Sequence, residues 1–279
     1  MITIREALRA GEAALETAGV PDAGYDAALL LGHILQENPL SLRADGARPL
    51  PPETMAAYGE LLRRRAGREP LQYITGEAPF MGLLLRAAPG VLIPRFDTET
   101  LCQQALDRLQ GRERVLDLCT GSGALAVAIA HERPHARVFA GDVSETALAL
   151  ARENAARVGV SVDCRLGDLF APFAGERFDM IVSNPPYIPS ADLPGLMPEV
   201  RREPALALDG GLDGLDFYRR IIGEAPGYLN PGGWLLLEAG SDQIPAVLAL
   251  MAADFEQTEA YDDLNGLPRV AAGRVKEAR

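Results

Sequence analysis

The segment Arg114-Val-Leu-Asp-Leu-Cys-Thr-Gly-Ser-Gly123 decides the fold. Its first five residues are predicted to form a strand, and Gly121 and Gly123 then mark a tight turn before a helix over 124–132. Glycine allows backbone geometry and close ligand approach that a Cβ would hinder. A strand, a glycine-rich turn and a helix in this order are typical of the first unit of a ligand-binding α/β fold.

Helical and strand patterns alternate around this segment. Helices are expected at 97–110, 145–157, 215–224 and 242–253, and strands at 137–142, 162–167, 178–183, 234–239, 255–261 and 268–274. This alternation predicts parallel β-α-β units, with helices on both faces of one sheet. Ligands of such sheets bind at the carboxyl ends of the strands, near the point where the strand order reverses.

The N-terminal part has a helical pattern instead. Thr3 and Glu6 form a capping-box pattern, and helices are expected from Thr3 to about Gly19, over 26–36 and over 52–67. Short strands at 80–85 and 91–93, around Pro89-Gly90, indicate a β-hairpin. We therefore expect a helical substrate-docking domain (1–75), a β-hairpin linker (76–94) and an α/β domain (95–279).

Composition bounds the class of protein. The 279 residues are 48% hydrophobic and 24% charged, which is typical of a globular chain. A net charge of −12 disfavours a nucleic-acid partner, because proteins that bind nucleic acids usually present a basic face. Cys102, Cys119 and Cys164 fit neither a zinc site nor a disulfide framework, and no signal peptide or membrane span is evident. We expect a cytoplasmic protein without a metal.

Three acids follow successive predicted strands. Asp117 precedes the glycine turn, while Asp142 and Asp168 end the next two strands. Asp142 has the position of an acid that binds ribose hydroxyls, and Asp168 could receive an adenine amino group. Any one acid could instead cap a turn, and residues 121–126 also fit a dinucleotide fingerprint. Together, the acids favour S-adenosylmethionine, which carries a sulfonium and an ammonium group.

The segment Asn184-Pro-Pro-Tyr187 directly follows the strand predicted at 178–183. Because both prolines restrict φ, the Asn184 side chain and the Pro185 carbonyl can be held rigidly as acceptors. Two fixed acceptors suit a planar NH₂ group, whose nitrogen they orient toward an electrophile. The Tyr187 ring could stack on that group or stabilise nearby positive charge.

These motifs carry a family resemblance. Asp117-x-x-x-Gly121-x-Gly123, Asp142, Asp168 and Asn184–Tyr187 together resemble class I S-adenosylmethionine-dependent methyltransferases that act on an sp² or amide nitrogen. The segments 70–76, 91–95 and 203–210, with Gly82, Thr98 and Glu99, further resemble the PrmC/HemK family of peptide chain release factor glutamine methyltransferases. Cys119 replaces a usual glycine, and Phe96-Asp97 replaces Pro-Glu.

The resemblance implies a fold, a substrate and a set of site residues. The fold would be Rossmann-like, with a mostly parallel seven-stranded sheet and a small N-terminal helical bundle joined by the hairpin. The substrate would be the glutamine of the Gly-Gly-Gln motif of release factors, with the protein acting as a monomer. Catalysis would involve Asn184, Pro185 and Tyr187, and Pro186 would join them in binding substrate. The cofactor would contact Asp117, Cys119, Thr120, Gly121, Ser122, Gly123, Asp142, Val143, Asp168, Leu169 and Asn184.

Other functions share parts of this pattern. A DNA adenine methyltransferase has the same chemistry, although it needs a basic cleft. A ribosomal-protein glutamine methyltransferase would keep the same residues. A dinucleotide-dependent oxidoreductase leaves Asn184–Tyr187 unexplained, and a noncatalytic cofactor-binding module would not need Asn184 and Tyr187.

The predicted helix ending at Gly67 carries an arginine cluster. Arg63, Arg64, Arg65 and Arg68 complement the negative end of that helix in the simpler interpretation. The alternative is a docking patch for an acidic partner. None of the histidines (His33, His131 and His135) lies in a motif, so no general base is predicted.

Overall fold

The computed structural model describes residues 2–276. Within them the chain divides into two compact units. The helical unit runs to Gly76 and also contains Met197–Arg202, and the sheet unit comprises Glu77–Leu196 and the residues from Glu203 onward. The chain thus leaves the sheet unit for six residues and then returns to it.

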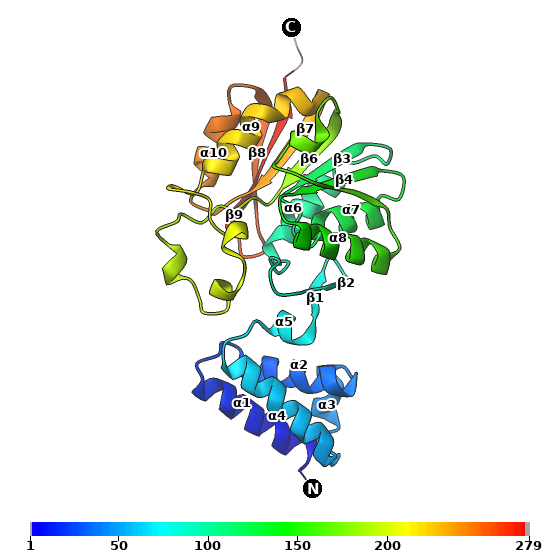
Figure 1. Cartoon of the computed structure of the whole chain (residues 1–279), viewed down its shortest axis with the longest axis vertical. Helices are drawn as coiled ribbons and strands as arrows, with labels where there is room; N and C mark the ends of the chain where they lie inside the picture. Colours follow the sequence, from blue (N-terminus) through cyan, green and yellow to red (C-terminus); the bar gives the residue numbers. More distant parts are fainter. Residues whose placement is uncertain (1, 277–279) are drawn as a thin grey trace. The chain divides into compact units, whose positions relative to one another are not determined.

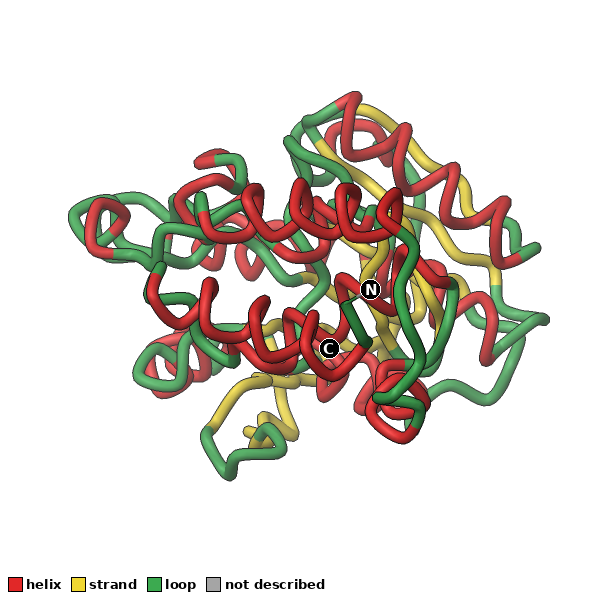
Figure 2. Tube along the Cα trace, turned by 90° about the horizontal axis from the view of Figure 1, so that it is seen from below, coloured by secondary structure: helices red, strands yellow, loops and turns green. Residues whose placement is uncertain are grey.

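The helical unit consists of helices joined by loops (Figure 2). Thr3 and Glu6 form the predicted capping box at the start of the first helix. A core of Ile4, Leu30 and other buried side chains holds the longer helices together. Two short helices were not predicted, because each has only five or six residues and starts at or directly after a proline. The bounds are α1 (Ile4–Thr17), α2 (Ala23–Leu35), α3 (Pro39–Ala44), α4 (Pro52–Ala66), α5 (Leu71–Thr75) and the 3₁₀ turn η3 (Val200–Arg202).

Buried ion pairs hold the segment 197–202 in the helical unit. Arg65 is only 5% exposed and donates to Asp26 over 2.6 Å and to Glu199 over 2.9 Å. Arg68 donates to both carboxylate oxygens of Glu199. Burial acts to raise the pKa of Glu199, but the hydrogen bonds from Arg68 and Arg65 outweigh it and lower the pKa to about 2.

The rest of the arginine cluster is paired as well. Arg63 binds Glu60, and Arg64 binds Glu69. All three arginines at 63–65 lie in the last turn of α4, where positive charge complements the helix end. The structure therefore gives these side chains partners within the helical unit and offers no unpaired basic patch at this position.

The sheet unit is an α/β structure around seven strands in the order β5-β4-β3-β6-β7-β9-β8. All pairs from β5 to β7 are parallel, and β9 is antiparallel to both of its neighbours. The strand order reverses between β3 and β6. The strands are β3 (Arg114–Leu118), β4 (Arg137–Asp142), β5 (Val162–Leu166), β6 (Phe178–Ser183), β7 (Leu229–Glu238), β8 (Phe255–Asp262) and β9 (Pro268–Val275).

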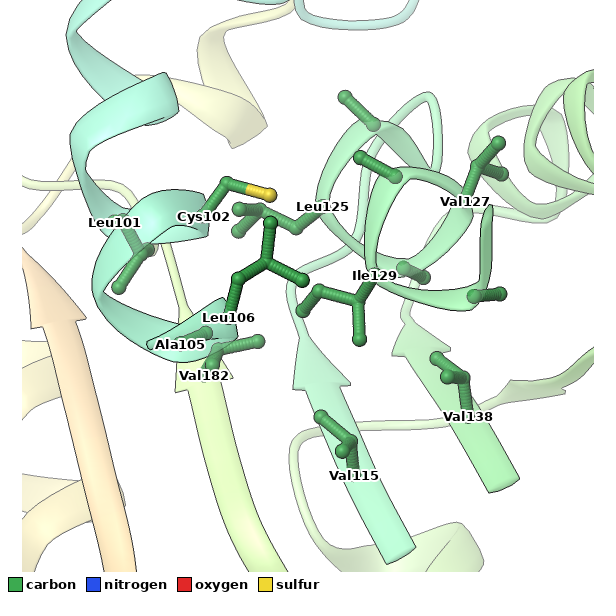
Figure 3. Close-up of a cluster of buried hydrophobic side chains, with 14 of the residues drawn as sticks. Leu101, Cys102, Ala105, Leu106, Val115, Leu125, Val127, Ile129, Val138 and Val182 are labelled. Carbon is green, nitrogen blue, oxygen red and sulfur yellow. The ribbon is translucent and has the colours of Figure 1, made fainter. Parts of the chain in front are cut away.

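Helices cover both faces of this sheet (Figure 1). One face of the sheet packs against the helices between residues 97 and 158, and the other face packs against the helices between residues 216 and 251. Figure 3 shows Cys102 and Leu106 of α6 directed toward Leu125 and Ile129 of α7 in the first of these layers. The helices are α6 (Asp97–Leu106), α7 (Ala124–Glu132), α8 (Glu145–Val158), α9 (Asp216–Tyr228) and α10 (Ile244–Met251), with 3₁₀ turns η1 (Ala171–Phe173), η2 (Leu193–Gly195) and η4 (Ala205–Ala207).

The hairpin differs from its sequence prediction. Strands β1 (Glu77–Phe80) and β2 (Leu83–Arg86) pair through a turn at Met81-Gly82, inside the single strand predicted at 80–85. Both turn residues have positive φ, 48° and 74°, as the turns that fit tight hairpins require. Residues 91–93, which were predicted as a strand, form none in the structure and line a pocket.

No helix among residues 2–276 is long and apolar enough to cross a membrane.

Candidate active site

A pocket that is partly open to solvent lies in the sheet unit at the carboxyl ends of β3, β4 and β6. Its position beside the reversal of strand order is where open α/β sheets bind ligands. Of the predicted site residues, the pocket is lined by Asp117, Cys119, Thr120, Gly121, Ser122, Asp142, Val143, Asp168, Leu169, Asn184 and Pro186. Gly123, Pro185 and Tyr187 are not among its lining residues.

Asp117 is the most deeply buried acid of the pocket, with 1% of its surface exposed. Its Oδ2 accepts hydrogen bonds from the Thr120 hydroxyl (2.6 Å) and the Ala126 amide (3.3 Å). Its Oδ1 has no hydrogen-bond partner among the described residues. Burial raises the pKa of Asp117 to about 7. A buried carboxylate with a free oxygen is suited to a cationic ligand.

Asp142 connects the glycine turn to the next loop. Its two carboxylate oxygens accept from the backbone amides of Gly121 and Ser144, both over 2.9 Å. Burial raises the pKa of Asp142, and these backbone hydrogen bonds act against that rise. Each oxygen keeps a second lone pair for a ligand hydroxyl.

The two turn glycines have different roles. A Cβ at Gly121 (φ 56°) would meet nothing within 4 Å, so this position leaves room beside Asp142. A Cβ at Gly123 would lie 2.8 Å from the Cβ of Ala151 on α8. Gly123 therefore serves the close packing of the turn against α8 and does not line the pocket.

Asp168 is more exposed than the other two acids. Its Oδ2 accepts from Arg220 of α9 over 2.6 Å, and the two side chains are about half exposed. Leu169 beside it is buried and has a positive φ of 45°. Asp168 therefore reaches the pocket margin as part of an ion pair that the sequence did not predict.

Asn184 follows β6 and has one side-chain hydrogen bond in the structure. Its Nδ2 donates to the Thr98 hydroxyl at the start of α6 over 3.1 Å. Ser183 before it is fully buried and donates to the Leu118 carbonyl. These contacts hold the end of β6 beside β3, with Asn184 in the pocket lining.

Tyr187 packs into the protein interior and does not line the pocket. Its ring packs against the buried cluster beneath α9 and α10, and burial raises its pKa to about 12. Its carbonyl accepts from Gln243, and a Cβ at Gly210 or Gly214 would collide with its backbone. The Asn184–Tyr187 segment is thereby clamped from the side of α9 and α10, and stacking of the Tyr187 ring on a substrate stays a prediction.

Part of the pocket comes from segments whose roles were not predicted. Glu203 is 5% exposed, accepts from the Ile93 amide (3.0 Å) and pairs with Arg95. This contact joins residues 91–95 to the loop that carries Leu206, another lining residue. The family resemblance of 91–95 and 203–210 was the available signal, whereas nothing in the sequence indicated Phe217, which also lines the pocket.

Glu238, the last residue of β7, is a second buried acid close to the pocket residues. It is 1% exposed, and its Oε2 has no hydrogen-bond partner among the described residues. Burial raises the pKa of Glu238 to about 7, while a hydrogen bond with Thr98 acts to lower it. No sequence motif pointed to this residue.

Cys119 adopts a left-handed backbone conformation, with φ of 57°. This conformation costs an L-residue about 1–2 kcal/mol relative to glycine. We therefore expect Cys119→Gly to be about 1 kcal/mol more stable than Cys119→Ala, measured as the free energy of urea unfolding. Cys164 lies in the extended strand β5, where the order of stabilities should be reversed: Cys164→Ala should be more stable than Cys164→Gly. Equal stabilities of the two Cys119 variants would contradict the assigned strain.

Comparison with known proteins agrees with this architecture. Residues 6–76 match the family model described as the PrmC N-terminal domain, and residues 94–193 match the methyltransferase small domain. Among solved structures, a methyltransferase from Pyrococcus furiosus covers 71% of this chain and 91% of its own, with TM-score 0.54 and 21% identity. A 16S rRNA methyltransferase from T. thermophilus has TM-score 0.55 and 19% identity over 72% of this chain and 50% of its own. These two likenesses show the fold alone.

Sequence relatives define the family. The release factor glutamine methyltransferase of Geobacter sulfurreducens is 48% identical over 98% of this chain and 97% of its own length. That of Deinococcus radiodurans is 42% identical over 97% of this chain and 98% of its own. Because these relatives match nearly the whole chain at more than 40% identity, the chain belongs to the family of release factor glutamine methyltransferases.

Proposed function

We propose that this protein transfers a methyl group from S-adenosylmethionine to the side-chain amide nitrogen of the glutamine in the Gly-Gly-Gln motif of peptide chain release factors. The observation that carries the proposal is the Asn184 amide, held in the same pocket as the unpaired carboxylate oxygen of Asp117. An acceptor for a planar NH₂ group and an anion for a cationic methyl donor thus share one cavity.

The pocket fits S-adenosylmethionine on its own chemistry. The free Oδ1 of Asp117 suits the ammonium group, and the open space at Gly121 lies beside Asp142, which suits the ribose hydroxyls. Leu169 and Phe217 supply apolar surface suited to the adenine ring. S-adenosylmethionine supplies an electrophilic methyl group when bound.

The residues after β6 orient the substrate. In the proposed mechanism, the Asn184 side-chain oxygen and the Pro185 carbonyl accept the two N–H groups of the glutamine amide, and Pro186 and Tyr187 support this segment. An amide nitrogen is a poor nucleophile because its lone pair is delocalised, so near-attack positioning supplies most of the rate, about 7–11 kcal/mol. The two acceptors bind more strongly as the nitrogen gains positive charge.

No general base is assigned. His33, His131 and His135 are absent from the lining of the pocket, and the nitrogen loses its proton after it has gained positive charge. The proposal includes release factors as the partner, a monomeric enzyme and a cytoplasmic location. The three free cysteines agree with a reducing compartment.

The test is transfer of labelled methyl groups to a purified bacterial release factor. We expect one methyl group per release factor and none on a factor whose Gly-Gly-Gln glutamine is replaced by alanine. Ribosomal proteins and double-stranded DNA are assayed in parallel. Preferred labelling of a ribosomal-protein glutamine or of adenine, with the release factor unlabelled, would overturn the assignment in favour of that substrate.

A further inference from the structure

We propose that Thr98 and Glu238 are positioning residues that orient the Asn184 amide, so that its Oδ1 faces the substrate. This inference rests on the proposed function, because it concerns how Asn184 receives an NH₂ group. The three residues come from the start of α6, the end of β7 and the end of β6, and form a linear series from Glu238 through Thr98 to Asn184.

The first step is the contact between Asn184 and Thr98. An asparagine side chain has an accepting oxygen and a donating nitrogen, which a 180° rotation exchanges. Nδ2 of Asn184 lies 3.1 Å from the Thr98 hydroxyl oxygen, and Thr98 is 5% exposed. With Nδ2 occupied by Thr98, Oδ1 is the atom left for the substrate.

The second step follows the Thr98 proton. A hydroxyl group can accept or donate, so Thr98 alone does not decide which end of the Asn184 amide it binds. Glu238 shares a side-chain hydrogen bond with Thr98, and above the Glu238 pKa of about 7 its ionised carboxylate only accepts. The Thr98 proton is therefore directed to Glu238, which leaves the Thr98 oxygen to accept from Nδ2.

The third step concerns the reversed amide. If Nδ2 faced the substrate, two donors would meet, and the glutamine NH₂ group would lose one of its two acceptors. The mismatch therefore costs the substrate a hydrogen bond. Thr98 and Glu238 thus select the productive orientation through the Asn184 amide.

Glu238 has the features of a residue kept for function. A buried carboxylate with an unpartnered oxygen reduces stability unless it is compensated. The charged and titratable groups that act on Glu238 are Asp97 of α6, Arg95 before that helix, Arg269 of β9, Tyr187 after β6 and Tyr218 of α9. Figure 3 shows the apolar packing of α6 through Leu101, Cys102 and Leu106, which fixes Thr98 in place at the start of this helix.

The experiment compares matched pairs in the full-length enzyme with a release factor as substrate. Thr98→Val keeps the shape but removes the hydroxyl, and Thr98→Ser restores it. We expect Thr98→Val to lower kcat on the order of 10- to 100-fold, while Kd for S-adenosylmethionine, from calorimetry, stays within threefold of wild type. Thr98→Ser should recover most of kcat.

The second pair separates positioning from stability. Glu238→Met removes both acceptor oxygens, and Glu238→Gln keeps one. We expect kcat to fall in the order wild type, Gln, Met, while the Tm of Glu238→Met at pH 8 is not below that of wild type. A structural role would instead lower Tm and kcat together.

Two results would overturn the inference. One is equal kcat for Thr98→Val and Thr98→Ser, and the other is a loss of S-adenosylmethionine affinity that accounts for the whole loss of activity. Failure of the proposed function is distinguishable, because the wild-type enzyme would then leave the release factor unlabelled. The same variants would next be measured on whichever NH₂ substrate the wild-type enzyme methylates.

Discussion

Replacing Asn184 with alanine is expected to remove most methyl transfer while S-adenosylmethionine still binds. In the proposed mechanism, the substitution deletes one of two acceptors and leaves the Pro185 carbonyl alone to orient the glutamine NH₂ group. Loss of one preorganised hydrogen-bonding group costs on the order of 10²- to 10³-fold in kcat. Single-turnover methyl transfer to a release factor measures this loss, and calorimetry measures cofactor binding separately.

The matched control is Asn184→Asp, which has nearly the same shape and keeps oxygen acceptors at this position. We expect it to retain more activity than Asn184→Ala. An alanine variant whose kcat stays within threefold of wild type would rule out the role assigned to Asn184. If cofactor affinity falls as much as kcat does, the role of Asn184 would be cofactor binding and not substrate orientation.

The second large effect is expected for Asp117→Asn, which removes the buried charge and keeps the shape. Truncating one member of a buried ion pair costs about 2–5 kcal/mol, so the Kd for S-adenosylmethionine should rise on the order of 100-fold. The same change at Asp168, which is half exposed and paired with Arg220, should cost under about 1 kcal/mol. Equal effects at the two positions would contradict the assignment of the ammonium site to Asp117.

The same variant predicts a pH dependence. Because burial raises the folded-state pKa of Asp117 to about 7, its contribution to stability is fully present below its unfolded pKa near 4 and is lost as pH rises through 7. Asp117→Asn should therefore gain about 3 kcal/mol of stability relative to wild type between pH 5 and pH 8. Glu238 titrates in both proteins, so the difference isolates Asp117.

Cofactor affinity should change with pH in the opposite direction. A cationic ligand binds the ionised form of Asp117, so wild-type affinity should increase as pH rises through about 7, with a proton released on binding below that pH. The affinity of Asp117→Asn for the cofactor should not increase as pH rises through about 7. Calorimetry in buffers of different ionisation enthalpy measures the released proton.

Much of the sheet unit follows from local pattern. The strands predicted at 114–118, 137–142 and 178–183 have the same bounds in the structure. Parallel strands bring their carboxyl ends to one edge of the sheet. The alternation of helices and strands therefore predicted that Asp117, Asp142 and Asn184 lie close together. Motif spacing therefore located the pocket and most of its predicted lining residues.

Long-range packing decided the parts that the sequence left open. The turn at Met81-Gly82 divides a run of residues that looked like one strand, because strand pairing and positive φ are not visible in composition. The sequence alone allowed two interpretations of the arginine cluster at 63–68: charges that complement a helix end, or a docking patch for an acidic partner. Glu199, more than 130 residues away, pairs with Arg65 and Arg68 in the folded helical unit.

The sequence by itself determined the α/β class of the sheet unit, the capped helix at the N-terminus, and the acids and the asparagine at the strand ends. These follow from periodicity, capping and the geometry of parallel strands, all of which are local. Only the tertiary structure decided which end of the Asn184 amide is free and which carboxylate oxygen lacks a partner. Thr98 and Asn184 are 86 residues apart, and a hydrogen bond across that separation exists only after both elements have been packed against the same core.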